Sequence, residues 1–309
     1  MDFRNVAGLT IPAGSVESIK IGNVTVWSKN ANKYKILKDG VEVAEVTMSQ
    51  FVSAIQSGAA QEDWGIGAQI VIPYHDFWTD KDYELPFNFG TFTAYGEGKL
   101  GLQVNNGVPT QAVHYGEKEG SINFCSWENS YAYKWLNAYN TSYGLENDSY
   151  YAGKTGFLGC IPKDFSDAII PTYHGYSLTV LSKIFLLGLE NLYISVNKDV
   201  LVNSENNLKY YVYPMSGDGE NVAWDYWKNL IGTSSPLEVP QSNSNIIKEK
   251  IDKSVGSSVN SYWCTNKLKR TSQKNITGTF LQTHINSNGT LEPINSMSTS
   301  IYLPACVIG

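Results

Sequence analysis

The sequence predicts an α+β protein that is rich in strands and has few, short helices. Short runs of β-branched and aromatic residues recur along the 309 residues, separated by Gly, Asn and Asp, as expected of strands joined by tight turns. Apolar residues at helical spacing are confined to a few short segments. The length is sufficient to bury a substantial core in one large domain or two small ones.

The composition bears on function as well as on fold. Charged residues make up only 17% of the chain, so the polar surface must come largely from Asn, Ser, Thr and Tyr. The 20 Tyr and 8 Trp are typical of binding surfaces, although β-rich folds also use aromatic residues within their strands. A net charge of −6 argues against nucleic-acid binding, which requires a basic surface.

A small strand module is predicted over residues 1–31. Its apolar positions alternate with polar ones, and Gly22-Asn23 provides a turn before a polar linker. A unit of this size is too small to be stable alone. We therefore expect it to dock onto its own domain or onto a neighbouring chain.

Residues 32–60 predict a hairpin and a short helix that connect this module to the rest of the chain. Asp39-Gly40 lies between two alternating runs, which is a strong hairpin signal. Ser49 is the expected N-cap of the helix, whose inner face holds Phe51 and Ile55 and which ends at Gly58.

Residues 61–309 form the predicted main domain. Strands are expected at 69–73, 87–95, 101–104, 112–115 and 183–187, and short helices at 163–170 and 224–230. A further helix is expected to begin at Ser126, with an aromatic stripe formed by Trp127, Tyr131, Trp135, Leu136 and Tyr139. Such a stripe packs against a sheet or serves as a ligand platform.

The chain has few features of catalytic or cofactor chemistry. Gly96, Gly98 and Gly101 match G-x-G-x-x-G, but a strand is predicted after them where phosphate binding requires a helix. No G-x-S-x-G occurs, and the four cysteines are far apart, as in buried thiols. We therefore expect no cofactor and no enzyme activity.

Acidic residues suggest two further kinds of site. Asp80, Asp82 and Glu84 alternate and offer oxygen ligands for calcium, although the same pattern is typical of a solvated turn. Asp76, Glu128 and Asp225 lie near aromatic residues, as glycosidase acids do, but their spacing does not select a pair.

Neither a membrane span nor a secretion signal is expected. No run of about 18 apolar residues occurs, and the N-terminus lacks an apolar signal core. The protein is therefore expected to fold in a cytoplasm.

Several motifs follow one another along the main domain: Ser126-Trp-Glu-Asn-Ser130 with Lys134-Trp-Leu-Asn137, Phe157-Leu-Gly with Lys163-Asp-Phe, Ser182-Lys-Ile-Phe-Leu-Leu-Gly-Leu-Glu190, Ser261-Tyr-Trp-Cys-Thr265 and Leu303-Pro-Ala-Cys-Val-Ile308. In this order they resemble a domain family of unknown function that is common in phage structural proteins. The residues that carry the resemblance are Trp127, Ser130, Trp135, Leu136, Asn137, Tyr262, Trp263 and Pro304. The chain departs from the family pattern at Cys264-Thr265 and at Leu303.

This resemblance implies a C-type-lectin-like fold for the main domain. The N-terminal segment is similar to a strand module of phage tail and head appendage proteins, in which attachment to the particle would use Leu9, Ile11, Pro12, Val26 and Trp27. We therefore expect a virion surface protein, assembled in the bacterial host cytoplasm, that binds other virion proteins, host glycan and further copies of itself. The alternatives are a purely structural capsid decoration or baseplate component, and a cell-wall glycan hydrolase. The loops at 140–176 and 262–297 are the expected binding surface.

Overall fold

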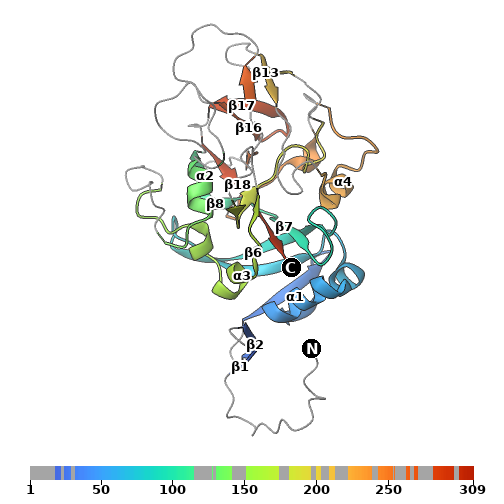
Figure 1. The fold of residues 1–309 in the computed structure, drawn as a ribbon. Helices are drawn as coiled ribbons and strands as arrows, with labels where there is room; N and C mark the ends of the chain where they lie inside the picture. The colour runs from blue at the N-terminus through green and yellow to red at the C-terminus, as the bar shows by residue number, and fades with distance from the viewer. Residues whose placement is uncertain are drawn as a thin grey trace, which may run out of the picture.

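The computed structural model describes residues 18–21, 24–28, 32–114, 127, 130–140, 151–173, 181–195, 200–202, 209–212, 222–238, 243–252, 254, 262–264, 268–270, 281–295 and 299–309. Within them the protein is β-rich with few helices, which confirms the predicted α+β class. Figure 1 shows a large sheet that includes the C-terminal strand, with the five-stranded and three-stranded sheets above it and helices α1 and α3 below it.

The large sheet has seven strands, and every pair of neighbouring strands within it is antiparallel. Its strand order is β11 (Phe185–Leu186), β19 (Pro304–Ile308), β7 (Leu100–Val104), β6 (Lys81–Thr91), β5 (Gln69–Asp76), β3 (Lys33–Lys38) and β4 (Val41–Thr47). The last strand in sequence order, β19, therefore lies between two other strands and not at an edge of the sheet.

Smaller sheets complete the β structure. The five-stranded sheet has the order β17 (Leu291–Asn295), β16 (Leu281–Ile285), β14 (Tyr262–Trp263), β18 (Thr299–Tyr302) and β8 (Val108–His114). A three-stranded sheet contains β12 (Val200–Val202), β13 (Lys209–Val212) and β15 (Leu268–Arg270). Two strand pairs are formed by β1 (Ser18–Ile21) with β2 (Val24–Ser28) and by β9 (Thr172–Tyr173) with β10 (Leu181–Ser182).

The described helices are short. They are α1 (Met48–Ser57), α2 (Tyr131–Leu136), α3 (Lys163–Ala168) and α4 (Asp225–Ile231), with a π-helical turn at Ala60–Trp64 and 3-10 turns at Phe157–Gly159 and Ser244–Ile246. None of them is long and apolar enough to cross a membrane.

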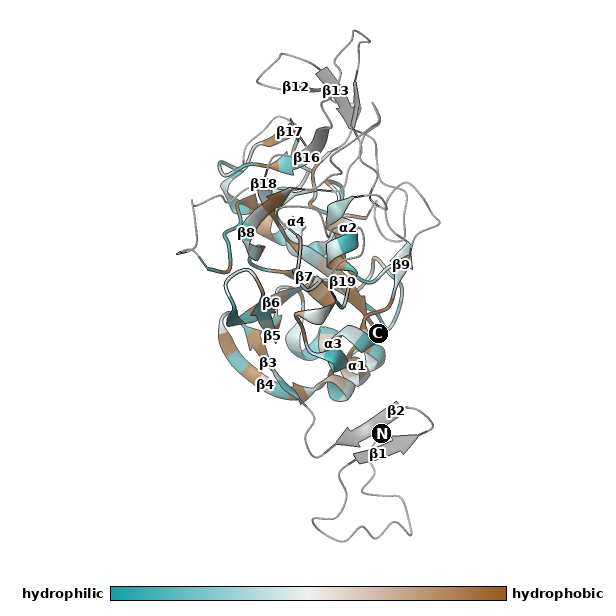
Figure 2. Ribbon diagram, turned by 90° about the vertical axis from the view of Figure 1, so that its left-hand side faces the viewer, coloured by the Kyte–Doolittle hydropathy of each residue, from teal (hydrophilic) through white to brown (hydrophobic). Residues whose placement is uncertain are grey.

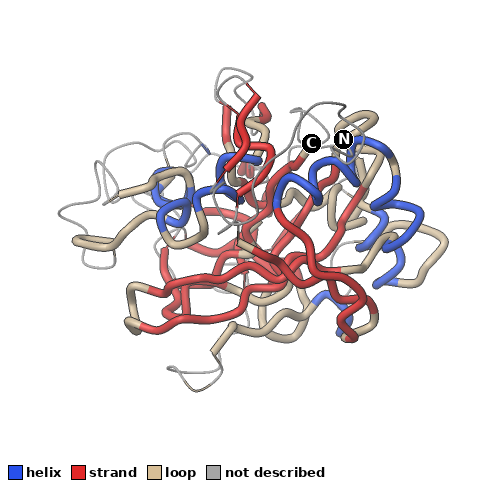
Figure 3. Tube along the Cα trace, turned by 90° about the horizontal axis from the view of Figure 1, so that it is seen from below, coloured by secondary structure: helices blue, strands red, loops and turns tan. Residues whose placement is uncertain are grey.

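One face of the large sheet packs against helices α1 and α3, which Figure 3 shows from below. The ring of Phe89 lies 5.6 Å from that of Phe51 on α1, and Phe87 lies 5.3 Å from Phe165 on α3. Period-2 alternation places these residues and Ile70 on the same face. The apolar interior that this produces is visible as brown strand segments in Figure 2.

The opposite face is covered by the start of α4. A Cβ atom at Gly90 or at Gly101 would overlap or crowd the ring of Trp224. The indole of Trp227, one turn later, donates to Gln103 Oε1 at 2.8 Å. The two glycines therefore allow an aromatic helix start to lie directly on the strands.

Residues 32–60 are integrated with the main domain, because their two strands, β3 and β4, belong to the large sheet and their helix, α1, packs against it. The hairpin β3–β4 turns at Asp39 and Gly40, which both have positive φ, as predicted. Its inner strand β3 pairs with β5, which joins it to the main domain. The N-cap of α1 is Thr47 and not Ser49, because Thr47 and Gln50 form a capping box; Gly58 ends the helix as expected.

The N-terminal module is described only as the antiparallel pair β1–β2, with Val26 and Trp27 on β2. Leu9, Ile11 and Pro12 lie outside the described residues. The predicted helix start at Ser126 lies outside them as well, and α2 begins at the N-cap Ser130, whose hydroxyl accepts from Tyr133 N.

Candidate functional site

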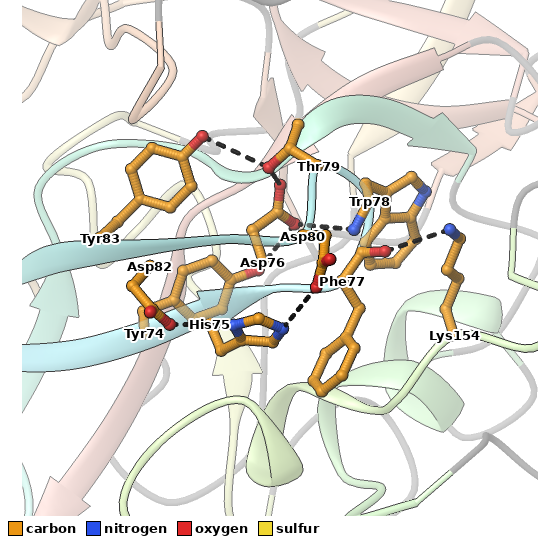
Figure 4. A network of polar contacts seen from close by, with 10 residues as sticks. All are labelled: Tyr74, His75, Asp76, Phe77, Trp78, Thr79, Asp80, Asp82, Tyr83 and Lys154. Carbon is orange, nitrogen blue, oxygen red and sulfur yellow. Dashed lines mark hydrogen bonds and ion pairs between the residues drawn. The ribbon is translucent and has the colours of Figure 1, made fainter.

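The turn between β5 and β6 forms the centre of the candidate site (Figure 4). It is held by the buried carboxylate of Asp76, which accepts hydrogen bonds from Thr79 Oγ1 at 2.8 Å and from Trp78 N at 3.4 Å. The hydroxyl of Thr110, on β8, also donates to this carboxylate, and Tyr74 OH lies 3.5 Å from it. Several donors from two sheets thus fix the conformation of the turn.

The inner side of the turn is anchored by Trp78. Its ring lies edge-on to Trp135 at 5.2 Å and to Tyr151 at 6.3 Å. Lys154 Nζ donates to the carbonyl of Phe77 at 3.1 Å and lies 5.7 Å from the ring centre of Trp78. The acidic cluster and the loop-rich stretch that the sequence indicated separately therefore meet at this turn.

The outer side of the turn presents an aromatic ring beside charged groups. Phe77 is 37% exposed and packs edge-on against His75 with 4.3 Å between ring centres. His75 Nδ1 lies 2.9 Å from Asp82, and its Nε2 lies 3.4 Å from Asp80. Both carboxylates are more than nine-tenths exposed. They are therefore available to accept hydrogen bonds from a polar ligand.

The proposed calcium ligands do not converge in this arrangement. Asp80 and Asp82 lie on either side of His75, whereas Glu84 pairs with Lys35 at 3.0 Å. Among the residues that the structure describes, no three His, Cys, Asp or Glu side chains are placed to hold a metal ion. The solvated-turn interpretation fits this geometry better.

Hydrogen bonds through Tyr83 connect the turn to the segment around residue 252. Tyr83 OH lies 3.3 Å from Thr79 Oγ1 and donates to Asp252 Oδ2 at 2.9 Å. Hydrogen bonds from the hydroxyl and the backbone N–H of Ser254, with that from Tyr83, lower the pKa of Asp252 to about 2. Asp252 is therefore a fixed anion at neutral pH.

The motif residues of the main domain have structural contacts. The side-chain amide of Asn137 accepts from Lys183 N and Ile184 N and donates to Ile184 O, all within 3.0 Å. Other contacts of this kind are Trp127 Nε1 to Ser182 Oγ, Trp135 Nε1 to Thr155 O, Tyr262 OH to Ile246 O and Trp263 Nε1 to Val113 O. Leu136 and Pro304 are buried. Trp127, Trp135 and Leu136 of the predicted stripe are thus buried in the core, whereas Tyr131 is partly buried and Tyr139 is half-exposed.

The remaining residues considered in the sequence, namely the cysteines, the Gly-rich motif and the isolated acids, occupy structural positions where the structure describes them. Cys160, Cys264 and Cys306 are buried thiols that form no disulfide with one another, and burial raises the pKa of each. Gly101 lies on strand β7 and not at a helix start, as predicted. Asp225 pairs with Lys228 within α4 at 3.1 Å, and Glu128 and Cys125 lie outside the described residues.

Sequence reasoning missed one buried polar cluster. Lys248 is only 9% exposed, and its Nζ donates to Tyr226 OH at 3.0 Å and to Asn105 Oδ1 at 3.3 Å. Its ammonium lies 5.1 Å from the ring centre of Trp227. Burial lowers the pKa of Lys248 to about 8. No local pattern marks this lysine, because Asn105 is 143 residues away.

Comparisons with known proteins leave the chain without a relative on which to base a function. No protein-family model matches it, and neither a curated protein nor a solved structure does.

Proposed function

We propose that the protein is a virion surface component that binds host-surface glycan through the turn at residues 77–80. One observation carries this proposal. The turn is fixed from inside by Asp76 and Trp78, and it presents Phe77 to solvent beside two exposed carboxylates. A rigid aromatic ring next to hydrogen-bond acceptors is the composition that a sugar-binding surface requires.

The chemistry of this surface suits a neutral sugar ring. The face of Phe77 offers apolar contact to the C–H groups of a pyranose, and Asp80 and Asp82 accept hydrogen bonds from its hydroxyls. Because the turn is already ordered, binding loses little conformational entropy in the protein. Phe77 supplies the stacking energy in this arrangement, and the carboxylates determine orientation.

Residues 1–31 are the proposed attachment module, consistent with the resemblance to phage appendage proteins. A two-stranded pair such as β1–β2 is marginal on its own and gains stability by pairing with a partner. We assign that role to other virion proteins, with Val26 and Trp27 among the attachment residues, and we assign the C-type-lectin-like fold to the main domain. Copies are then arranged about a symmetry axis of the particle, as in most homo-oligomers.

The binding site is tested with the purified full chain on an array of bacterial surface polysaccharides. Phe77→Ala should weaken binding to a bound glycan about tenfold, the equivalent of roughly 1.4 kcal/mol of stacking. Leu181→Ala, which removes an exposed apolar side chain elsewhere, is the matched control and should bind as the unmodified chain does. Equal binding by the Phe77 variant, or no glycan bound at all, contradicts the site.

The location is tested separately by immunogold microscopy of virions, with an antibody raised against residues 61–309. Gold on the tail tip supports a role in attachment to the host, and gold over the head supports a head appendage. Particles without gold contradict the virion assignment.

A second candidate function, as a purely structural component, is favoured by the edge strand β4. Val41 and Val43 are 63% and 50% exposed there, beside a strand edge that pairs with no other described strand and that a neighbouring subunit can cover. Replacing both with Ser should prevent incorporation into particles while leaving glycan binding intact. Normal incorporation of that variant argues against an interface at β4.

A further inference from the structure

The cluster around Lys248 brings a buried amine against a side-chain amide. Lys248 Nζ lies 3.3 Å from Asn105 Oδ1, and the same oxygen accepts a hydrogen bond from Asn88 Nδ2 at 3.2 Å. Asn88 is itself 1% exposed and oriented by Gln69, which donates to its Oδ1 at 2.9 Å. The carbonyl of Asn105 is therefore polarised by a fixed donor.

Backbone hydrogen bonds hold the segments of Asn105 and Lys248 in place. Asn105 N donates to Pro86 O at 2.8 Å, which ties Asn105 to strand β6. Two residues later, Gly107 N donates to Glu249 O at 2.7 Å, and Ile251 N donates back to Gly107 O at 3.1 Å. The segments at 105–107 and 248–251 thus lie side by side in one register, which keeps amine and amide together.

The surroundings of Lys248 favour an uncharged nitrogen. Within the part of the chain that the structure describes, Lys248 forms no ion pair, and its neighbours are the ring of Trp227 and the hydroxyl of Tyr226. A buried cation without an anion is costly, and its pKa of about 8 leaves part of the population as free amine at neutral pH. A neutral amine is a nucleophile.

We propose that Lys248 and Asn105 react to form an intramolecular isopeptide bond. The lone pair of Lys248 Nζ attacks Asn105 Cγ, and the Asn88 amide stabilises the oxyanion that develops on Oδ1. The hydroxyl of Tyr226, 3.0 Å from Nζ, passes the amine proton to the departing Nδ2. The Cγ–Nδ2 bond then breaks, ammonia leaves, and a neutral amide replaces the buried charge.

The test is the intact mass of the purified full chain, followed by peptide mapping. The chain should be lighter than its sequence mass by one ammonia, and proteolysis should release one branched peptide that joins the segments of Asn105 and Lys248. Lys248→Met should restore the full mass, and the presence or absence of the branched peptide in the unsubstituted chain decides the matter if that variant does not fold.

One side reaction has the same mass signature and is distinguished by the same variant. Asn106-Gly107 is a sequence that also loses ammonia, by cyclising to a succinimide on its own backbone. That loss would persist in Lys248→Met and would give no branched peptide. A full mass in the unmodified chain, or an ammonia loss that survives Lys248→Met, overturns the proposal.

Discussion

Replacing Asn137 with Ala should destabilise the protein by about 3 kcal/mol. The amide of Asn137 bridges the end of α2 to the segment before β11, where it serves Lys183 N, Ile184 N and Ile184 O at 2.9 to 3.0 Å. Each of these backbone groups loses its partner in the variant, at about 1 kcal/mol net per hydrogen bond. A further hydrogen bond, from Asn137 Nδ2 to Tyr133 O at 3.2 Å, adds little, because the backbone N–H of Asn137 donates to the same oxygen at 3.1 Å.

The assay is equilibrium unfolding in urea, followed by the fluorescence of the 8 Trp. Asn245→Ala is the matched control, because it removes one exposed hydrogen bond, to Leu230 O at 2.9 Å, and should cost less than about 1 kcal/mol. Asn137→Asp keeps the acceptor but loses the donor, so its cost should lie between the two. If Asn137→Ala costs no more than the Asn245 control, the bridging role assigned to this amide is refuted.

Three further predictions concern packing, acid stability and thiol chemistry. Gly90→Ala should cost about 2 kcal/mol in urea unfolding, because its methyl group meets the ring of Trp224, and it should cost clearly less in a Trp224→Leu background; an equal cost in both argues against this contact. Burial lowers the pKa of His284 from 6.5 to about 4, so the unfolded chain binds more protons than the folded chain between these pH values. The free energy of unfolding therefore decreases as the pH is lowered through this range. His284→Gln should remove about 2 kcal/mol of the loss between pH 7 and pH 5, and an unchanged pH profile contradicts this. In a Cys125→Ser variant, the three buried thiols should react with Ellman's reagent only after denaturation, and rapid reaction of the native chain contradicts their burial.

Local signals in the sequence predicted local structure well. The Asp39-Gly40 turn fixed the β3–β4 hairpin, and Gly58 ended α1 where it was expected to, because positive φ is a property of the turn residues themselves. The start of α1 was missed by two residues because a capping box at Thr47 competes with Ser49. Such errors are small and stay within one turn.

Contacts between distant segments could not be predicted. The acidic cluster was recognised from its spacing, but the donor from Thr110 that fixes Asp76 comes from another sheet. The neighbours of Lys248 are brought together only by the fold, so no motif pointed to them. The C-type-lectin-like fold and the virion role were inferred from resemblance alone, and both stay predictions.

The position of β19 has a consequence for the way the chain is synthesised. Residues 304–308 complete the sheet between β11 and β7, so the ribosome must release nearly 200 residues beyond β7 before that sheet can close. Until then the edge of β7 that pairs with β19 is open, and an unpaired strand edge favours aggregation. A premature stop codon a few residues upstream therefore yields a chain without β19, in which β11 and β7 lack the strand that joins them.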